Sequence, residues 1–333
     1  MDTKKLASFF NYPADVIKSI THLEKMEYDT YYCSHYKFPL LVHETITSKT
    51  GKPAEGHEHV DRRKIVDPYR KDPAINEKDQ FSFEEYKSLM KYGLSPGHNT
   101  AAGFHGTTRE IWDESFLMTN MTPQEMTFNS GIWVLIESWC RNLGSNPNIT
   151  NVHCFTGCVP DEEFVETAEG VRVNIPTHWF KIITAQDSHN PKTVYTLAFY
   201  MKNDKMFVKK METYPLGGFT VAVPKLDKLA NLNLNAIMEH YKIMMKGKTR
   251  LASLKQIMDI ELRPGRGLQI QMEKCNWYGR FIYAKSLDEL ERNWVEIQKM
   301  GDRYGDLQYH KEYYDYVKER MLEEEKAKSK AKS

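Results

Sequence analysis

Residues 95–141 read SPGHNTAAGFHGTTREIWDESFLMTNMTPQEMTFNSGIWVLIESWCR and carry the strongest chemical signal of the chain. A histidine follows a glycine near the start, a short apolar strand is predicted over 115–121, and Pro123 is expected to turn the chain. A helical pattern then begins near Asn129 and extends to Arg141. An imidazole, a neutral amide oxygen and a carboxylate thereby come close together. These groups suit metal-assisted cleavage of a phosphodiester bond, so we interpret the stretch as a candidate nuclease active site.

The predicted helix places four side chains at intervals of four residues: Asn129, Trp133, Glu137 and Arg141. Such spacing puts them along one slowly drifting stripe. At the helix start, the Asn129 amide oxygen can face a hard cation, and Mg²⁺ suits such a site because it prefers oxygen ligands and keeps several waters. Glu137 can hold water near that ion, and Arg141 can pair with Glu137 or face a phosphate. On spacing alone, an ordinary amphipathic helix with a capping Asn and a Glu–Arg pair is favoured.

His98 shifts this balance towards a catalytic site. It follows Gly97 at the end of a segment where the backbone can approach a substrate closely. A neutral imidazole is a suitable general base for activating water near neutral pH. Other histidines are interpreted as structural or surface residues, namely His43, His57, His59, His105 and His178.

The composition is typical of a soluble globular protein, with 41% hydrophobic and 27% charged residues among 333. No run of about 18 apolar residues occurs, so we expect no membrane span. The N-terminus resembles neither a secretory signal nor an Arg-rich mitochondrial presequence. Five cysteines are few and odd in number, which favours a reducing compartment and free thiols, with Cys154 in a buried strand, over a disulfide framework.

The net charge of +1 makes the distribution of basic residues more informative than their total. Between residues 240 and 258 there are five basic residues and no acid: Lys242, Lys246, Lys248, Arg250 and Lys255. Phosphate contact and a solvated surface both remain open for this segment. The alternating lysines at 326–332 favour a solvated surface.

The order of the predicted elements indicates an α+β fold. Strands are predicted over 36–47, 152–159, 171–185 and 194–201, a loop over 48–80, and helices over 81–93, 235–261, 286–298 and 309–326. Capping boxes are expected at Ser82–Glu85 and Ser286–Glu289. We expect three parts: an N-terminal arm at 1–35, a main domain at 36–234, and a C-terminal helical region at 235–333.

Several short motifs together resemble one protein family. They are S-x-G-H at 95–98, S-F-L-M-T-N-x-x-P-Q at 115–124, F-N-S-G-x-W-x-x-x-E-x-x-C-R at 128–141, T-G-C-V at 156–159 and I-P-T-H-W-F-K at 175–181. Asp61-Arg62-Arg63 lies upstream. In this order they resemble the DNA/RNA non-specific endonucleases of the ββα-metal (His-Me finger) fold, and within that family the EXOG-type mitochondrial enzymes. The likeness covers roughly residues 36–230, and the C-terminal helices weakly resemble the EXOG-type wing domain.

The resemblance implies a role for each matching position. His98 would be the general base, and Asn129 would be the protein ligand of one Mg²⁺ (or Mn²⁺). Glu137 would orient the water that the metal holds, and Arg62 and Arg141 would bind or neutralise phosphate. Lys246, Lys248 and Arg250 are the further candidates for nucleic-acid contact. The family also implies DNA and RNA as substrates, 5′-phosphate products, a homodimer and a mitochondrial location, with a cytoplasmic location as the alternative.

One position departs from the family pattern. Pro96 stands where the D/S-R-G-H signature has arginine, and proline carries no charge and no N–H. Loss of a charge-assisted hydrogen bond could cost on the order of 1.5–3 kcal/mol, or about ten- to a hundred-fold in rate. An active nuclease is therefore weighed against a catalytically impaired nuclease-fold protein that binds nucleic acid or acts as a structural subunit.

Overall fold

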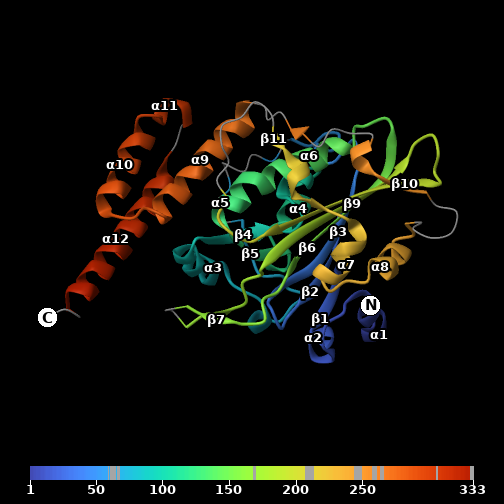
Figure 1. Ribbon diagram of the computed structural model, residues 1–333, viewed down its shortest axis with the longest axis horizontal. Coiled ribbons are helices and arrows are strands. Elements are labelled where there is room, and N and C mark those ends of the chain that lie inside the picture. The colour runs from blue at the N-terminus through green and yellow to red at the C-terminus, as the bar shows by residue number, and fades with distance from the viewer. Residues whose placement is uncertain are drawn as a thin grey trace.

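The structure is a computed structural model, and it describes residues 1–58, 60, 65, 68–167, 170–206, 214–243, 250–256, 261–262, 266–304 and 307–330. A central sheet forms its core, helices lie around it, and a group of C-terminal helices stands at one end (Figure 1). The expected α+β class is confirmed. Among the described helices, none is both long and apolar enough to cross a membrane.

The main sheet is largely antiparallel, as expected. Its strands are β1 (Ile20–Glu24), β2 (Tyr28–Cys33), β3 (Phe38–Ile46), β6 (Ile149–Val159), β9 (His178–Asp187), β10 (Thr193–Lys202), β12 (Thr220–Val221) and β13 (Arg250–Ser253). They follow the order β1-β2-β3-β6-β9-β10-β12, and β13 joins β10 in the parallel direction. The smaller ribbons are β4 (Leu94–His98) with β5 (Met121–Glu125), β7 (Val165–Glu166) with β8 (Arg172–Val173), and β11 (Tyr214–Pro215) with β14 (Glu261–Leu262).

Three of the predicted strands are confirmed as β3, β6 and β10. The strand predicted over 171–185 is wrong in its first half, since it divides into β8 and β9 with Pro176 between them. Proline lacks the N–H that a ladder needs, which explains the break. The prediction for residues 1–35 also needs correction. β1 and β2 extend the main sheet beside β3, and they bury Tyr31, Tyr32 and Cys33 completely.

The helices are α1 (Thr3–Phe9), α2 (Ala14–Lys18), α3 (Phe83–Leu89), α4 (Arg109–Glu114), α5 (Met126–Phe128), α6 (Val134–Leu143), α7 (Val223–Leu229), α8 (Leu234–His240), α9 (Arg266–Ile282), α10 (Leu287–Gln298), α11 (Gly301–Tyr304) and α12 (Gln308–Lys330). The predicted capping box of α3 is confirmed. The one at α10 is half formed, because Glu289 accepts from Lys285 N rather than from the Ser286 backbone. Helix α6 packs its apolar face on the sheet. There the Trp139 ring contacts the Phe199 ring edge-on, with ring centroids 5.9 Å apart.

The single helix expected over 235–261 is wrong. The chain forms α8, then β13 beside β10, then β14. Residues 250–253 pair in parallel with residues 193–196 of β10, and this long-range pairing overrides the local helical pattern. Helices α10 and α12 match the two later predictions.

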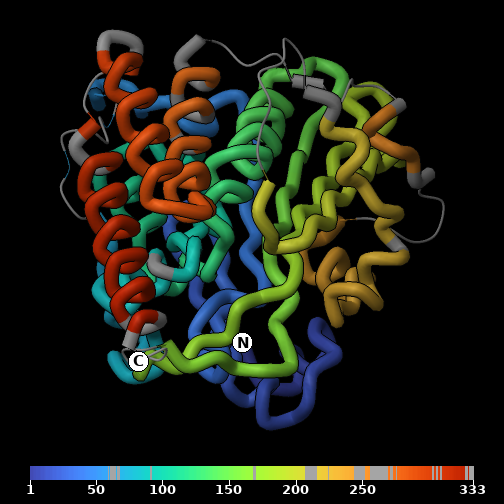
Figure 2. The backbone as a smooth tube through the Cα atoms, turned by 60° about the vertical axis from the view of Figure 1, so that its left-hand side comes forward, coloured from blue at the N-terminus to red at the C-terminus, as the bar shows by residue number. Residues whose placement is uncertain are grey.

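Helices α9, α10 and α12 share their own buried cluster, which includes Trp277, Phe281, Leu290, Tyr314 and Val317. Met126 of α5 belongs to the same cluster, so the C-terminal helices pack directly on the segment that follows β5. Figure 2 shows these helices, in orange and red, standing beside the cyan and green segments of the core.

Candidate active site

The stretch 95–141 folds as two strands and a helix. β4 and β5 pair antiparallel, with His98 opposite Met121 and Pro96 opposite Pro123. α5, a π-helical turn (Asn129–Trp133) and α6 follow without a break. The strand expected over 115–121 is therefore misplaced, because residues 118–120 form a 3-10 turn and the strand begins at Met121. Both prolines are tolerated because the ribbon has two strands, each with an unpaired edge.

Gly97 is required by close packing inside this ribbon. A Cβ at that position would lie 2.2 Å from Gln124 Oε1 and 2.6 Å from Gln124 Cβ. Gln124 is itself completely buried, so its side chain cannot easily move away from an added Cβ. The glycine before His98 therefore allows the two strands to approach, rather than supplying an unusual backbone angle.

Asn120 fixes the chain just after His98. Its side chain accepts from Thr100 N at 3.0 Å and donates to Thr100 O at 2.9 Å and Ser115 O at 2.8 Å. Its backbone carbonyl also accepts from Asn99 N at 3.0 Å. The strand predicted over 115–121 gave Asn120 no such role, although an amide within an apolar run (FLMTNM) is a sequence signal for it.

The half-buried His98 ring lies among aromatic side chains. Phe116 meets it edge-on with ring centroids 4.8 Å apart, and the Tyr69 ring lies 6.0 Å away. Tyr69 in turn stacks on Phe83 at 4.6 Å, which holds it in place. Tyr69 comes from the segment expected to be a loop, so its approach to His98 was not predicted.

Asn129 lies at the start of the π-helical turn, where its amide nitrogen donates to Ser95 Oγ at 2.9 Å. The Ser95 hydroxyl donates to the Gln124 carbonyl at 3.3 Å, so its oxygen is available as an acceptor. The four-residue stripe predicted from Asn129 to Arg141 needs correction at its first member. A π turn carries an extra residue, which shifts Asn129 relative to Glu137 on the helix surface.

Glu137 and Arg141 lie further along α6, and their chemical settings differ. Glu137 is half-buried, whereas Arg141 is exposed. Burial raises the pKa of Glu137 to about 7, and nearby Glu44 adds to this, while Lys181 and Arg141 oppose it. The Arg141 side chain lies close to Gly51, in a turn, and to Gly103, in the 3-10 turn Ala102–Phe104.

A network of buried charges lies beneath Glu137, and sequence reasoning did not identify it. The completely buried Lys181 ammonium donates to Thr156 Oγ1 and lies 5.3 Å from the Trp133 ring. Burial lowers the pKa of Lys181, but the neighbouring Cys154 and Glu44 outweigh this and hold it above the ordinary value. Glu44 also accepts from Thr100 Oγ1, two residues after His98.

His105, expected to be structural, occupies the far end of this network. Its Nδ1 lies 2.9 Å from Glu27 Oε2 and its Nε2 lies 2.6 Å from Thr100 Oγ1. Burial lowers the pKa of His105, but Glu27 and Glu44 overcome this and raise it to about 9. At neutral pH this raised pKa favours a protonated ring, which lies between the Glu27 and Glu44 carboxylates.

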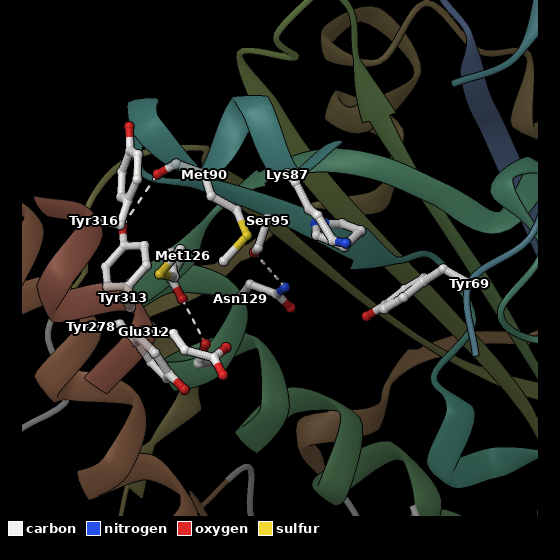
Figure 3. Close-up of a pocket in the computed structure, with 12 residues that line it drawn as sticks. Tyr69, Lys87, Met90, Ser95, Met126, Asn129, Tyr278, Glu312, Tyr313 and Tyr316 are labelled. Carbon is white, nitrogen blue, oxygen red and sulfur yellow. Dashed lines mark hydrogen bonds between the residues drawn. The ribbon is translucent and has the colours of Figure 1, made fainter. Parts of the chain in front are cut away.

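A cavity of about 380 Å³ opens beside Asn129 (Figure 3). Ser95, Pro96, Asn129 and Ser130 line it from the ββα segment. The remaining lining residues are Tyr69, Lys87, Met90, Met126, Tyr278, Glu312, Tyr313 and Tyr316. The C-terminal helices therefore form one wall of the candidate site. The helices predicted over 286–298 and 309–326 were not expected to contact this site.

The donor chemistry at Asn129 fits a hard divalent cation. Within the described part of the chain, no group of three or more His, Cys, Asp or Glu side chains is arranged to hold a metal. Asn129 instead offers one neutral oxygen beside open volume, which fits Mg²⁺ because that ion keeps several waters. In Figure 3 the Asn129 nitrogen faces Ser95 and its oxygen faces away from it.

Four of the predicted phosphate-binding residues have no described side chain. Arg62, Lys246 and Lys248 lie outside the described residues, and Arg250 lies in β13 but its side chain is not described. The structure thus brings Asn129 and Pro96 to one cavity and His98 to its neighbour Tyr69. It places Arg141 near the loops at Gly51 and Gly103.

Comparison with known proteins identifies the family of the chain. A family model described as DNA/RNA non-specific endonuclease matches residues 8–241. "Nuclease 1, mitochondrial" of Schizosaccharomyces pombe is 24% identical over 205 residues, which cover 59% of this chain and 60% of that protein. "Nuclease EXOG, mitochondrial" of Danio rerio is 23% identical over 242 residues, which cover 70% of this chain and 64% of that protein. The matches thus span less than two thirds of either relative.

A further relative is "Nuclease C1" of Cunninghamella echinulata, which is 26% identical over 219 residues, covering 63% of this chain and 81% of that protein. Among solved structures, a chain of the crystal structure of the EndoG/EndoGI complex superposes with a TM-score of 0.52 at 23% identity. That match covers 64% of this chain and 84% of the other. At this identity the structural likeness supports the fold.

Proposed function

Because this chain belongs to the DNA/RNA non-specific endonuclease family, we propose that it is a metal-dependent nuclease that hydrolyses phosphodiester bonds of DNA and also of RNA. The observation that carries the proposal is the order of β4, β5 and the following helix. This order puts His98 at the end of one strand and Asn129 at the first residue of the π-helical turn that follows α5, where Ser95 holds its amide.

Each candidate residue has one proposed role. His98 accepts the proton from the attacking water, while Phe116 and Tyr69 restrict the ring. The Asn129 oxygen holds Mg²⁺ or Mn²⁺, which supplies positive charge against the charge that develops on phosphate. The Glu137 carboxylate orients water once it is ionised, above about pH 7. Arg141 and Arg62 neutralise phosphate.

The proposed products carry 5′-phosphate ends, and the enzyme has little sequence preference. Contacts to phosphate fix a nucleic acid in place without reading its bases, so a site built on a cation and arginines discriminates weakly between sequences. Lys246, Lys248 and Arg250 are proposed to extend these contacts along the strand.

The test is cleavage of circular and end-labelled DNA by purified protein, with Mg²⁺ and with EDTA. We expect cutting only with the metal, and the products should be accepted by a ligase, which requires a 5′-phosphate. Cutting of the circle would establish an endonuclease. Cutting that continues in EDTA would contradict the metal requirement.

Pro96 supports a second candidate, a nuclease-fold protein with impaired turnover that binds nucleic acid. This proline lines the cavity beside Asn129, at the position where the family signature has arginine. If wild type binds DNA without cutting it and Pro96→Arg restores cutting, the chain is an impaired nuclease. If Pro96→Arg leaves both properties unchanged, a binding or structural role is favoured.

Location, assembly and domain division are further proposals. We propose a mitochondrial location and a homodimer, with two relatives named as mitochondrial nucleases in support of the first. We also keep the division at residue 234/235, although α8 packs in the core of the preceding part. Fractionation of cells tests the location, and light scattering of purified protein tests the dimer.

A further inference from the structure

The cavity beside Asn129 has two chemically different ends. Lys87 is the positively charged residue among those that line it, and it enters from α3. Glu312 and three tyrosines come from α9 and α12. Figure 3 shows Asn129 between Lys87 and Tyr69 on one side and Tyr278, Tyr313 and Glu312 on the other. A negatively charged group is therefore favoured near Lys87 and disfavoured near Glu312.

The Lys87 end adjoins the position where a signature arginine is missing. Pro96, Ser95 and Lys87 line the same cavity. The Lys87 side chain is 44% exposed, and its ammonium contacts Glu84 at 2.9 Å on the surface of α3. Glu84 is 79% exposed, so this pair is a solvated one that a phosphate could replace at little cost.

The opposite end combines the Glu312 carboxylate with an apolar and aromatic wall. Met90 and Met126 line it together with the half-buried Tyr316 and the buried Tyr313, whose hydroxyl is 3.3 Å from Met90 O. Flat aromatic and thioether surfaces suit the face of a nucleobase. The volume of about 380 Å³ lies within the range of about 300–1,000 Å³ typical of small-ligand sites.

We propose that this cavity is a subsite for one unpaired nucleotide of the substrate, with its phosphate at Lys87 and its base against the Met90–Tyr316 wall. The proposal rests on the proposed nuclease function, since Asn129 joins the subsite to the candidate metal ligand. A base in a duplex is stacked and paired, so it cannot enter without unpairing. The subsite therefore favours single strands and frayed ends over intact duplex.

The test measures binding rather than cleavage, so it can fail or succeed independently of the nuclease proposal. The full chain in EDTA is titrated with a fluorescein-labelled single-stranded 12-mer, and with the same 12-mer carrying abasic positions. The variants are Lys87→Met and Tyr316→Leu. Their matched controls are Lys71→Met, which removes another partly exposed lysine that has an acidic neighbour, and Tyr92→Leu, which removes a tyrosine outside the cavity.

Tyr316→Leu should weaken binding of the intact 12-mer roughly tenfold and leave binding of the abasic one nearly unchanged. Lys87→Met should weaken both, and it should lower the slope of log Kd against log salt by about 0.7, the value for one phosphate contact on a single strand. The double variant Lys87→Met/Pro96→Arg should restore the wild-type slope of log Kd against log salt, because the new arginine supplies a positive charge at the same end of the cavity. Equal effects of Tyr316→Leu on both oligonucleotides, or no effect of either cavity variant, would overturn the proposal.

Discussion

The Asn129 amide nitrogen donates to Ser95 Oγ at 2.9 Å, which joins the first residue of the π-helical turn to strand β4. Because the Ser95 hydroxyl already donates to the Gln124 carbonyl, it accepts from the amide and sets its orientation. The Asn129 oxygen is then the atom presented to a cation. A single serine thus links the sheet ribbon, the helix and the proposed metal ligand.

Ser95→Ala removes the group that orients this amide. We expect a lower cleavage rate, by roughly five- to tenfold for one hydrogen bond of about 1 kcal/mol, and a higher Mg²⁺ concentration for half-maximal rate. Ser88→Ala, which removes a hydroxyl that bonds within α3, serves as the control. Wild-type metal dependence in Ser95→Ala would show that the amide is oriented without this serine.

Gly97→Ala tests the close approach of β4 and β5. The added Cβ meets Gln124 atoms at 2.2 and 2.6 Å, so we expect a loss of about 1–3 kcal/mol in the free energy of unfolding. Urea denaturation measures it. Gly301→Ala is the matched control because a Cβ there meets nothing within 4 Å. Equal stability of both variants would contradict the tight packing.

Glu137 makes stability depend on pH with a definite sign. Burial raises its folded pKa to about 7 from an ordinary value near 4.5, so between these values the folded chain binds more protons than the unfolded chain. The contribution of Glu137 to the free energy of unfolding therefore falls as pH rises from about 5 to 7. The difference between the free energies of unfolding of wild type and Glu137→Gln, measured by urea titration in EDTA, should fall over this pH range. Parallel pH curves would contradict the raised pKa.

Tyr283→Phe tests how the C-terminal helices are held beside the site. The Tyr283 hydroxyl donates to Glu125 Oε1 at 2.7 Å, and Glu125 Oε2 accepts from Phe128 N at 2.7 Å at the start of α5. Removing the hydroxyl leaves a buried carboxylate oxygen without that donor, so we expect a loss of roughly 1.5–3 kcal/mol in the free energy of unfolding. Tyr92→Phe is the control. An unchanged unfolding curve would show that the hydrogen bond between Tyr283 and Glu125 does not contribute to the free energy of unfolding.

Local patterns predicted much of the fold. Alternation and β-branched residues located β3, β6 and β10, and the spacing of apolar residues located α10 and α12. Errors arose where long-range pairing decides the outcome. Residues 20–33 contain many polar side chains, yet they form β1 and β2 because β2 pairs with β3 and β1 pairs with β2. Residues 250–253 pair with residues of β10 that lie 57 positions earlier, as in Thr193 with Arg250.

In the candidate site, too, local patterns were predicted and long-range contacts were not. The motif placed Asn129 in a helical segment, as the structure does, but no strand was predicted at 94–98, where His98 ends β4. It could not show that Ser95 bonds Asn129, that Lys181 lies buried near Glu137, or that Tyr316 lines the cavity. Those contacts join residues that are distant in the sequence, and a helical period in one segment carries no information about its partner.

The most direct measurement is single-turnover cleavage of labelled DNA by wild type, His98→Ala and Asn129→Ala over a range of Mg²⁺ concentrations, with DNA affinity measured in EDTA. We predict metal-dependent cutting by wild type. His98→Ala should cut about 10²- to 10⁴-fold more slowly at every Mg²⁺ concentration, with unchanged affinity for DNA. Asn129→Ala should need far more Mg²⁺. Cleavage at the wild-type rate by both variants would contradict the assignment of this site.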